Sequence, residues 1–165
     1  MENMLKELID ILENQAKLFR SLLDILAIEK KAVVSAKLDA VNSARIQKEA
    51  ILALIHAGDE KRKDMVKKIS DRLGCPQGLT LTQLAQHVDV PFSLKLVRCA
   101  ADISSLVQNI HQKNEVNKSL LTHSLKLVRS SINLLVQMMT PSPVYFRTGK
   151  MYQGEICGTV LSSNV

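Results

Sequence analysis

The chain has 165 residues, of which 46% are hydrophobic and only 3% aromatic, and its 22 basic and 16 acidic residues give a formal net charge of +6. This length favours one domain, and a core so poor in aromatic side chains argues against a β-sandwich or barrel. The basic excess is spread thinly along the sequence, so it lacks the concentrated stripe of a DNA-reading surface.

A first helix is predicted over residues 3–35. Its apolar residues are spaced alternately by three and four, which places them on one stripe of a helix. They are Leu5, Leu8, Leu12, Ala16, Phe19, Leu23 and Leu26. We expect a break over residues 35–39, where Ser35 and Asp39 can cap helix ends, before a second helix over residues 38–73.

The second helix is predicted to have a seam with apolar ends and a polar middle. The seam positions are Val41, Arg45, Lys48, Leu52, Ile55, Asp59, Arg62, Val66, Ile69 and Leu73. Lys48, Asp59 and Arg62 either pair within the bundle, since Asp59 and Arg62 are three apart, or face water where two helices splay. Gly74 suits the left-handed position after a helix, and Pro76 prevents its continuation.

Two further helices are predicted downstream. Thr80 with Gln83 forms a capping box for a short helix over residues 80–88, and Pro91 can open a helix over residues 92–139, which contains no Gly or Pro. The predicted fold class is therefore all-α, an elongated antiparallel bundle of three long helices plus one short helix over residues 1–139.

An irregular, flexible tail is expected over residues 140–165. Tyr145, Phe146 and Tyr152 are three of the five aromatic residues of the chain, and they lie in a segment too short and too rich in glycine to form its own core. We expect them to bind a partner, because disordered tails are normally depleted in aromatic residues. The alternative is a disordered tail with incidental apolar residues.

No catalytic, cofactor or metal site is predicted. The four histidines form no H-E-x-x-H pair, and His111 with Glu115, four residues apart, supplies only two of the ligands that a metal needs. No Gly-rich phosphate-binding motif or nucleophile elbow is present, so we expect no enzyme and no cofactor. The amphipathic start, the lack of a spanning apolar stretch and three widely spaced cysteines predict a cytoplasmic protein without stable membrane insertion.

Residues 80–98 offer an alternative function, because they have the outline of a DNA-binding helix-turn-helix. The pattern is weak: Asp89 stands where the turn normally has Gly, and Lys95 and Arg98 occupy positions that must be apolar for the second helix to pack on the first. We therefore expect no nucleic acid partner. A structural coiled-coil oligomer is a further alternative, since long apolar seams can exchange between copies and give a homodimer or a swapped form in crystals.

Several segments occur in an order and spacing that match a known family. They are residues 22–31, residues 35–41, residues 48–55, Arg62, the N-x-x-N of Asn114 and Asn117, and Tyr145 with the glycines after it. In this order the sequence resembles the FlgN-like family of cytoplasmic flagellar export chaperones over nearly the whole chain. It departs at Phe146, where the family more often has Gly.

The resemblance implies a helical chaperone for hook-associated proteins, the proteins of the hook–filament junction. Such a chaperone binds the C-terminal helical segments of its clients, prevents their premature association and docks on the flagellar export apparatus at the membrane. Our candidate client-binding residues are Leu134, Leu135, Met138, Met139, Tyr145, Phe146, Tyr152 and Ile156. Asn114 and Asn117 are expected to set the register between helices or to meet a client backbone, with bundle packing favoured for Asn117.

Overall fold

The computed structural model of the chain describes residues 1–76 and 78–139. Within these ranges it contains four α-helices and no strand, which confirms the predicted all-α class with three long helices and one short helix. The helices are α1 (Glu2–Val34), α2 (Leu38–Leu73), α3 (Leu81–Ala85) and α4 (Phe92–Met139). The tail expected over residues 140–165 lies outside the described residues.

The chain divides into two compact units, Met1–Leu121 and Thr122–Val165. The first unit holds all of α1, α2 and α3 together with residues 92–121 of α4. The described part of the second unit is a single stretch of helix, residues 122–139.

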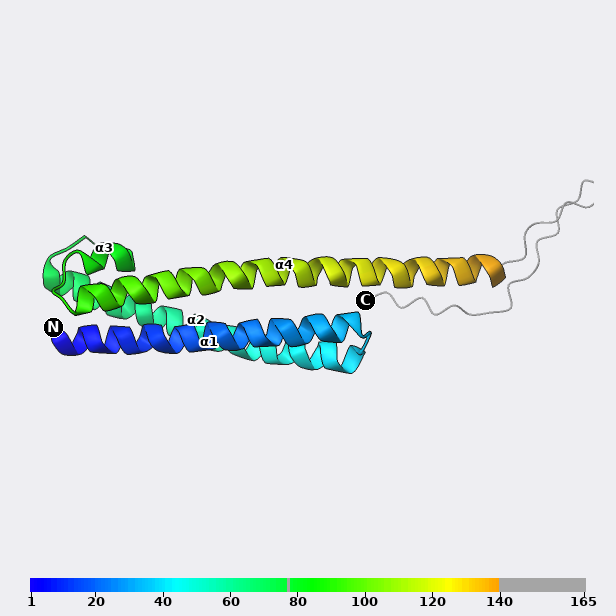
Figure 1. Cartoon of the computed structure of the whole chain (residues 1–165), viewed down its shortest axis with the longest axis horizontal. Helices are drawn as coiled ribbons and strands as arrows, with labels where there is room; N and C mark the ends of the chain where they lie inside the picture. Colours follow the sequence, from blue (N-terminus) through cyan, green and yellow to red (C-terminus); the bar gives the residue numbers. More distant parts are fainter. Residues whose placement is uncertain (77, 140–165) are drawn as a thin grey trace, which may run out of the picture. The chain divides into compact units, whose positions relative to one another are not determined.

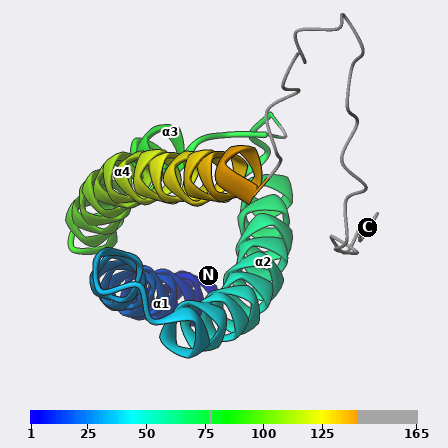
Figure 2. The same cartoon turned by 90° about the vertical axis from the view of Figure 1, so that its right-hand side faces the viewer.

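Within the first unit, α1, α2 and the first part of α4 form the predicted antiparallel bundle. α1 and α2 pack against each other in opposite directions, and α4 starts where α2 ends and runs back alongside α1 (Figure 1). Seen along the helices, α1 and α2 lie next to each other and α4 completes the bundle (Figure 2).

The loop between α1 and α2 is three residues long, at the predicted break. The hydroxyl of Ser35 donates to the carbonyl oxygen of Lys31 at 2.8 Å, and Ala36 adopts a left-handed φ of 52°, which turns the chain. Asp39 does not cap α2 but lies in its first turn, where a negative charge is favourable at the positive end of the helix dipole. The N-cap position is Lys37, which makes no side-chain cap.

The capping box predicted before α3 is present, with both reciprocal hydrogen bonds between Thr80 and Gln83. The predicted extent of this helix, residues 80–88, is wrong, because α3 ends at Ala85. The amides of Gln86 and His87 bond to carbonyls only three residues back, and this tighter turn ends the α-helical pattern.

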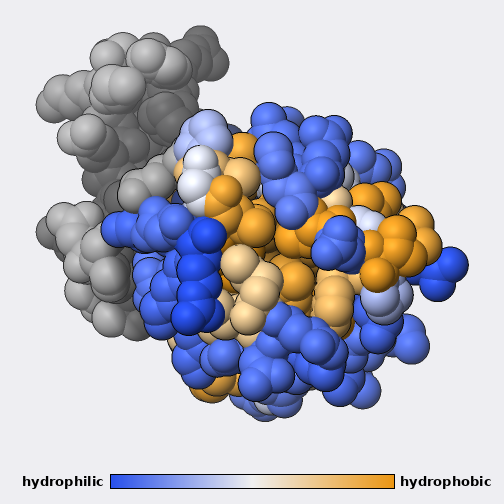
Figure 3. All heavy atoms as spheres, turned by 90° about the vertical axis from the view of Figure 1, so that its left-hand side faces the viewer, coloured by the Kyte–Doolittle hydropathy of each residue, from blue (hydrophilic) through white to orange (hydrophobic). Residues whose placement is uncertain are grey.

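The main core of the first unit lies at the end where α3 is found. Its buried residues are Leu5, Leu8, Ile9 and Leu12 of α1, Met65, Val66 and Ile69 of α2, Leu84 and Ala85 of α3, and Leu96 of α4. On the face at that end, apolar side chains gather in the middle and hydrophilic side chains surround them (Figure 3). α3 therefore closes the core although it is only five residues long.

Replacement by alanine is expected to have opposite effects on stability at Gly74 and at Gly58. Gly74 ends α2 with a φ of 65°, so Gly74→Ala should lower the free energy of unfolding by about 1 kcal/mol through backbone strain. Gly58 lies inside α2, and a Cβ there would meet Gln15 Cγ at 3.4 Å, an ordinary contact. Gly58→Ala should therefore raise this free energy by up to about 1 kcal/mol. Urea unfolding followed by circular dichroism measures both, and two changes of the same sign would contradict the prediction.

Candidate functional site

A buried polar network joins α1, α2 and α4 in the first unit. Glu29 Oε1 accepts a hydrogen bond from Lys48 Nζ at 2.5 Å, and Glu29 Oε2 accepts one from Asn117 Nδ2 at 2.8 Å. Asn117 Nδ2 also donates to the backbone carbonyl oxygen of Leu26 at 2.8 Å. Glu29 and Asn117 are only 3% and 2% exposed, and Lys48 is partly buried.

This network satisfies the polar groups that it buries. A carboxylate that loses its water needs a cation and hydrogen-bond donors in exchange, and Lys48 and Asn117 supply them to Glu29. Both amide hydrogens of Asn117 are used. Asn117 thus makes an interhelical contact, which fixes the turns of α1 and α4 that face each other. Asn114, three residues earlier, is exposed.

The polar middle of the α2 seam is organised by two separate ion pairs. Lys48 pairs across helices with Glu29, whereas Arg62 pairs within α2, its Nε and Nη2 donating to Asp59 Oδ1 at 3.0 and 2.6 Å. Burial raises the pKa of Asp59, but the hydrogen bonds from Arg62 and Lys63 outweigh it and hold this pKa below its usual range. Pairing within the bundle is therefore the arrangement that these polar residues adopt.

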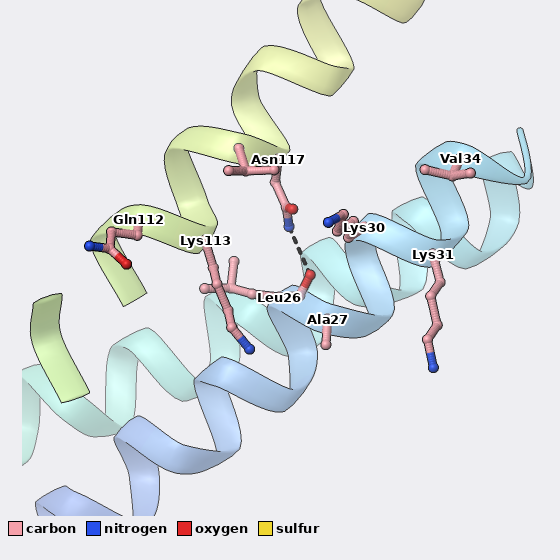
Figure 4. Close-up of a pocket in the computed structure, with 9 residues that line it drawn as sticks. Leu26, Ala27, Lys30, Lys31, Val34, Gln112, Lys113 and Asn117 are labelled. Carbon is pink, nitrogen blue, oxygen red and sulfur yellow. Dashed lines mark hydrogen bonds between the residues drawn. The ribbon is translucent and has the colours of Figure 1, made fainter. Parts of the chain in front are cut away.

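Beside the network, α1 and α4 border a groove of about 640 Å³ (Figure 4). Its lining residues are Leu26, Ala27, Lys30, Lys31 and Val34 of α1 and Gln112, Lys113, Val116 and Asn117 of α4. In Figure 4 the two helices supply opposite sides of the groove, and the hydrogen bond from Asn117 to Leu26 ties them together. The groove combines apolar side chains with three lysines and has no carboxylate in its lining.

The sequence-based site predictions included Asn117 but not Glu29 or the other residues that line the groove. A signal for Glu29 was present, because it lies three residues after Leu26 and four before Val33 on the buried stripe of α1, where an apolar residue is expected. The groove has no comparable signal, because it depends on how α1 and α4 pack.

In the second unit, residues 122–138 are all exposed. Its exposed large hydrophobic residues are Leu125, Leu127, Val128, Ile132, Leu134, Leu135, Val136 and Met138. Residues 122–139 also contain Lys126 and Arg129 and no Asp or Glu. We call residues 122–139 the α4 terminal segment. Its surface combines these exposed apolar side chains with two basic residues.

The predicted client-binding residues fall into two groups. Leu134, Leu135 and Met138 are 59%, 59% and 76% exposed on the α4 terminal segment, and Met139 is the last residue of α4. The others, Tyr145, Phe146, Tyr152 and Ile156, lie outside the described residues.

Residues 80–98 do not form a compact pair of short helices. α3 has five residues, and the helix that follows it continues for 48 residues. Lys95 and Arg98 are exposed, and Leu96 of the same turn is the residue that packs into the core.

Residues 1–76 and 78–139 contain no group of three His, Cys, Asp or Glu residues that could hold a metal ion. In the same part of the chain, none of the helices has the length and apolar character needed to cross a membrane.

The chain was compared with known proteins and families. Neither the curated proteins nor the solved structures gave a match. The family model described as FlgN protein matches residues 1–153, a range that includes all four helices. The chain therefore belongs to the FlgN family of flagellar export chaperones.

Proposed function

We propose that this protein is a cytoplasmic chaperone that binds hook-associated proteins, prevents their premature association and delivers them to the flagellar type III export apparatus. Family membership supports the general role. The observation that carries the client-binding part is the α4 terminal segment, in which eight large hydrophobic side chains are exposed. Exposed apolar surface of this extent marks a protein-interaction site.

The α4 terminal segment suits capture of a client helix. Leu127, Leu134 and Met138 lie at i, i+7 and i+11, on one face of α4, and are all more than half exposed. A client helix that lays its apolar face on this surface removes both apolar surfaces from water, at roughly 25 cal/mol for each Å² buried. The client face is then no longer free to associate with other subunits.

Residues 140–156 are proposed to complete this client-binding region. Tyr145, Phe146, Tyr152 and Ile156 follow the α4 terminal segment directly in the sequence. Aromatic side chains contribute large contact areas and are enriched among the residues that dominate binding energy. A client held by both parts would be covered over a longer stretch of its helix.

The α4 terminal segment is tested with the double variant Leu134→Asp, Met138→Asp. The ligand is the C-terminal helical segment of a hook-associated protein from the same bacterium, and isothermal titration calorimetry measures its affinity. We expect binding at least about tenfold weaker, because two carboxylates replace apolar contacts on one face, a loss of about 1.4 kcal/mol or more. Circular dichroism checks that the helical content is unchanged.

The matched control is Ser104→Asp, Gln108→Asp, which adds the same charge at the same spacing on an exposed part of α4 in the first unit. It should bind the client as the original protein does. Deleting residues 140–165 should also weaken binding by about tenfold while the helical content of residues 1–139 is kept. Undiminished client binding by the Leu134→Asp, Met138→Asp variant would overturn the assignment.

A further inference from the structure

The groove between α1 and α4 lies on residues of the first unit that the proposed client-binding region does not include. On α1, Leu26, Lys30 and Val34 recur every four residues, so they form a strip along the helix, and Lys113 and Val116 of α4 face it from the other side. From Leu26 to Val34 the helix rises by eight residues, about 12 Å at 1.5 Å per residue. This is the length of roughly two turns of a helix laid alongside.

The groove offers apolar contact at its borders. Val34 and Val116 are 71% and 47% exposed, although both are aliphatic. Asn117 at the base is fully engaged with Leu26 and Glu29, so the base is held in place and offers no free amide hydrogen. A ligand that fits here must bring apolar side chains to meet the two valines.

The charge at the groove has one sign. Lys30, Lys31 and Lys113 line it, and within residues 1–76 and 78–139 none of these three ammonium groups forms an ion pair with a carboxylate. The nearest carboxylate along α1, Glu29, is buried and paired with Lys48. Cations on both sides of an apolar strip create a potential that favours a ligand with negative charges.

The positive charge of the groove helps to decide which protein segment could bind there. Residues 140–165 of the same chain carry Arg147 and Lys150 against a single acidic residue, Glu155. The exposed α4 terminal segment of a second copy carries Lys126 and Arg129 and no acidic residue. Both have the same sign as the groove, so charge complementarity favours a different protein.

We propose that the groove between α1 and α4 docks an amphipathic helix of a partner protein, in which Asp and Glu side chains flank an apolar face. Its apolar residues cover Val34 and Val116, and its carboxylates pair with Lys30, Lys31 and Lys113. This proposal is independent of the client-binding assignment, because the two surfaces share no residue.

The probe is a fluorescent amphipathic peptide of about 18 residues, five helical turns, with Leu on one face and Glu on both flanks. A second peptide carries Lys in place of every Glu. Fluorescence anisotropy with the full-length protein should show binding of the Glu peptide that is at least about tenfold tighter than that of the Lys peptide. The affinity for the Glu peptide should fall as salt is added.

Two groove variants and a matched control locate the binding. Lys30→Glu, Lys113→Glu should weaken binding of the Glu peptide by at least about tenfold, and Val116→Ser, which leaves the charge unchanged, by about threefold. The control Lys67→Glu, Lys68→Glu changes the net charge equally at two exposed positions of α2 and should have less than about a twofold effect. Circular dichroism checks the helical content of each variant, and the client affinity of the Lys30→Glu, Lys113→Glu variant should be unchanged.

Three results would overturn the proposal. Equal losses from the groove and control charge reversals would mean that the peptide responds only to net charge. Tighter peptide binding after Tyr145→Ser, Phe146→Ser would mean that residues 140–165 of the same chain occupy the groove. A dimer that sediments with the original protein and is lost in the Lys30→Glu, Lys113→Glu variant would identify a second copy as the occupant.

Discussion

Replacing Lys48 with methionine is expected to lower the free energy of unfolding by about 3 kcal/mol or more. The substitution keeps an unbranched side chain but removes the cation that pairs with Glu29 Oε1 at 2.5 Å. Glu29 is 3% exposed, so its carboxylate would remain buried without a compensating charge. Urea unfolding followed by circular dichroism measures the loss.

The matched control removes both charges together. Glu29→Met, Lys48→Met leaves no uncompensated ion, and replacement of a buried pair by apolar residues is often neutral or stabilising. We therefore expect the double variant to recover part of the stability lost by Lys48→Met, because Asn117 keeps its hydrogen bond to Leu26 but loses the one to Glu29. A double variant as unstable as the single one would show that the pair is not coupled.

Leu84→Ala is expected to lower the free energy of unfolding by about 3–5 kcal/mol, although it changes a helix of only five residues. Leu84 is 0% exposed and packs in the core with residues of α1, α2 and α4. Truncation removes its apolar contacts and leaves a cavity among side chains held by three long helices, which cannot easily collapse to fill it.

The control for Leu84→Ala is the same substitution at Leu94, near the start of α4. The side chain of Leu94 is 58% exposed. Its truncation should cost less than about 1 kcal/mol, since little apolar surface returns to water. Thermal and urea unfolding of both variants test the difference. Equal small losses would mean that α3 does not close the core.

The helices could be predicted because their signals are local. Gly74 ends α2 in the left-handed conformation, and Thr80 with Gln83 forms the expected capping box, since each depends on a few neighbouring residues. The end of α3 could not be predicted, because no Gly or Pro marks the point where the hydrogen bonds of Gln86 and His87 tighten.

The inward faces of the long helices were predicted only approximately. On α4, the spacing of Ile103, Val107 and Ile110 by four and three residues predicts that Val107 faces the core, but Leu106 is the buried residue, at 8% exposure against 45% for Val107. A helix of 3.6 residues per turn drifts relative to a spacing of three and four, so the buried stripe moves around a helix as long as α4.

The polar network could be predicted in part. Lys48 and Asn117 each interrupt an apolar seam, and such residues are expected to find partners. The sequence does not show which ones meet, because Glu29 lies 19 residues from Lys48 and 88 from Asn117, and the pairing depends on the register of three helices. The groove was missed for the same reason.

The contacts that hold α4 to α1 join residues far apart in the sequence, which affects the order in which the helices can pack during synthesis. Asn117 bonds to a carbonyl 91 residues earlier, and Asp102 pairs with Arg20, 82 residues earlier, whereas α1 and α2 are joined by a loop of three residues. Because synthesis proceeds from the N-terminal end, α1 and α2 emerge from the ribosome before α4 and can pair with each other first. Until α4 follows, the side of α1 that α4 later covers is open to water, so each new copy of this chaperone passes through a stage in which its own apolar face is unprotected.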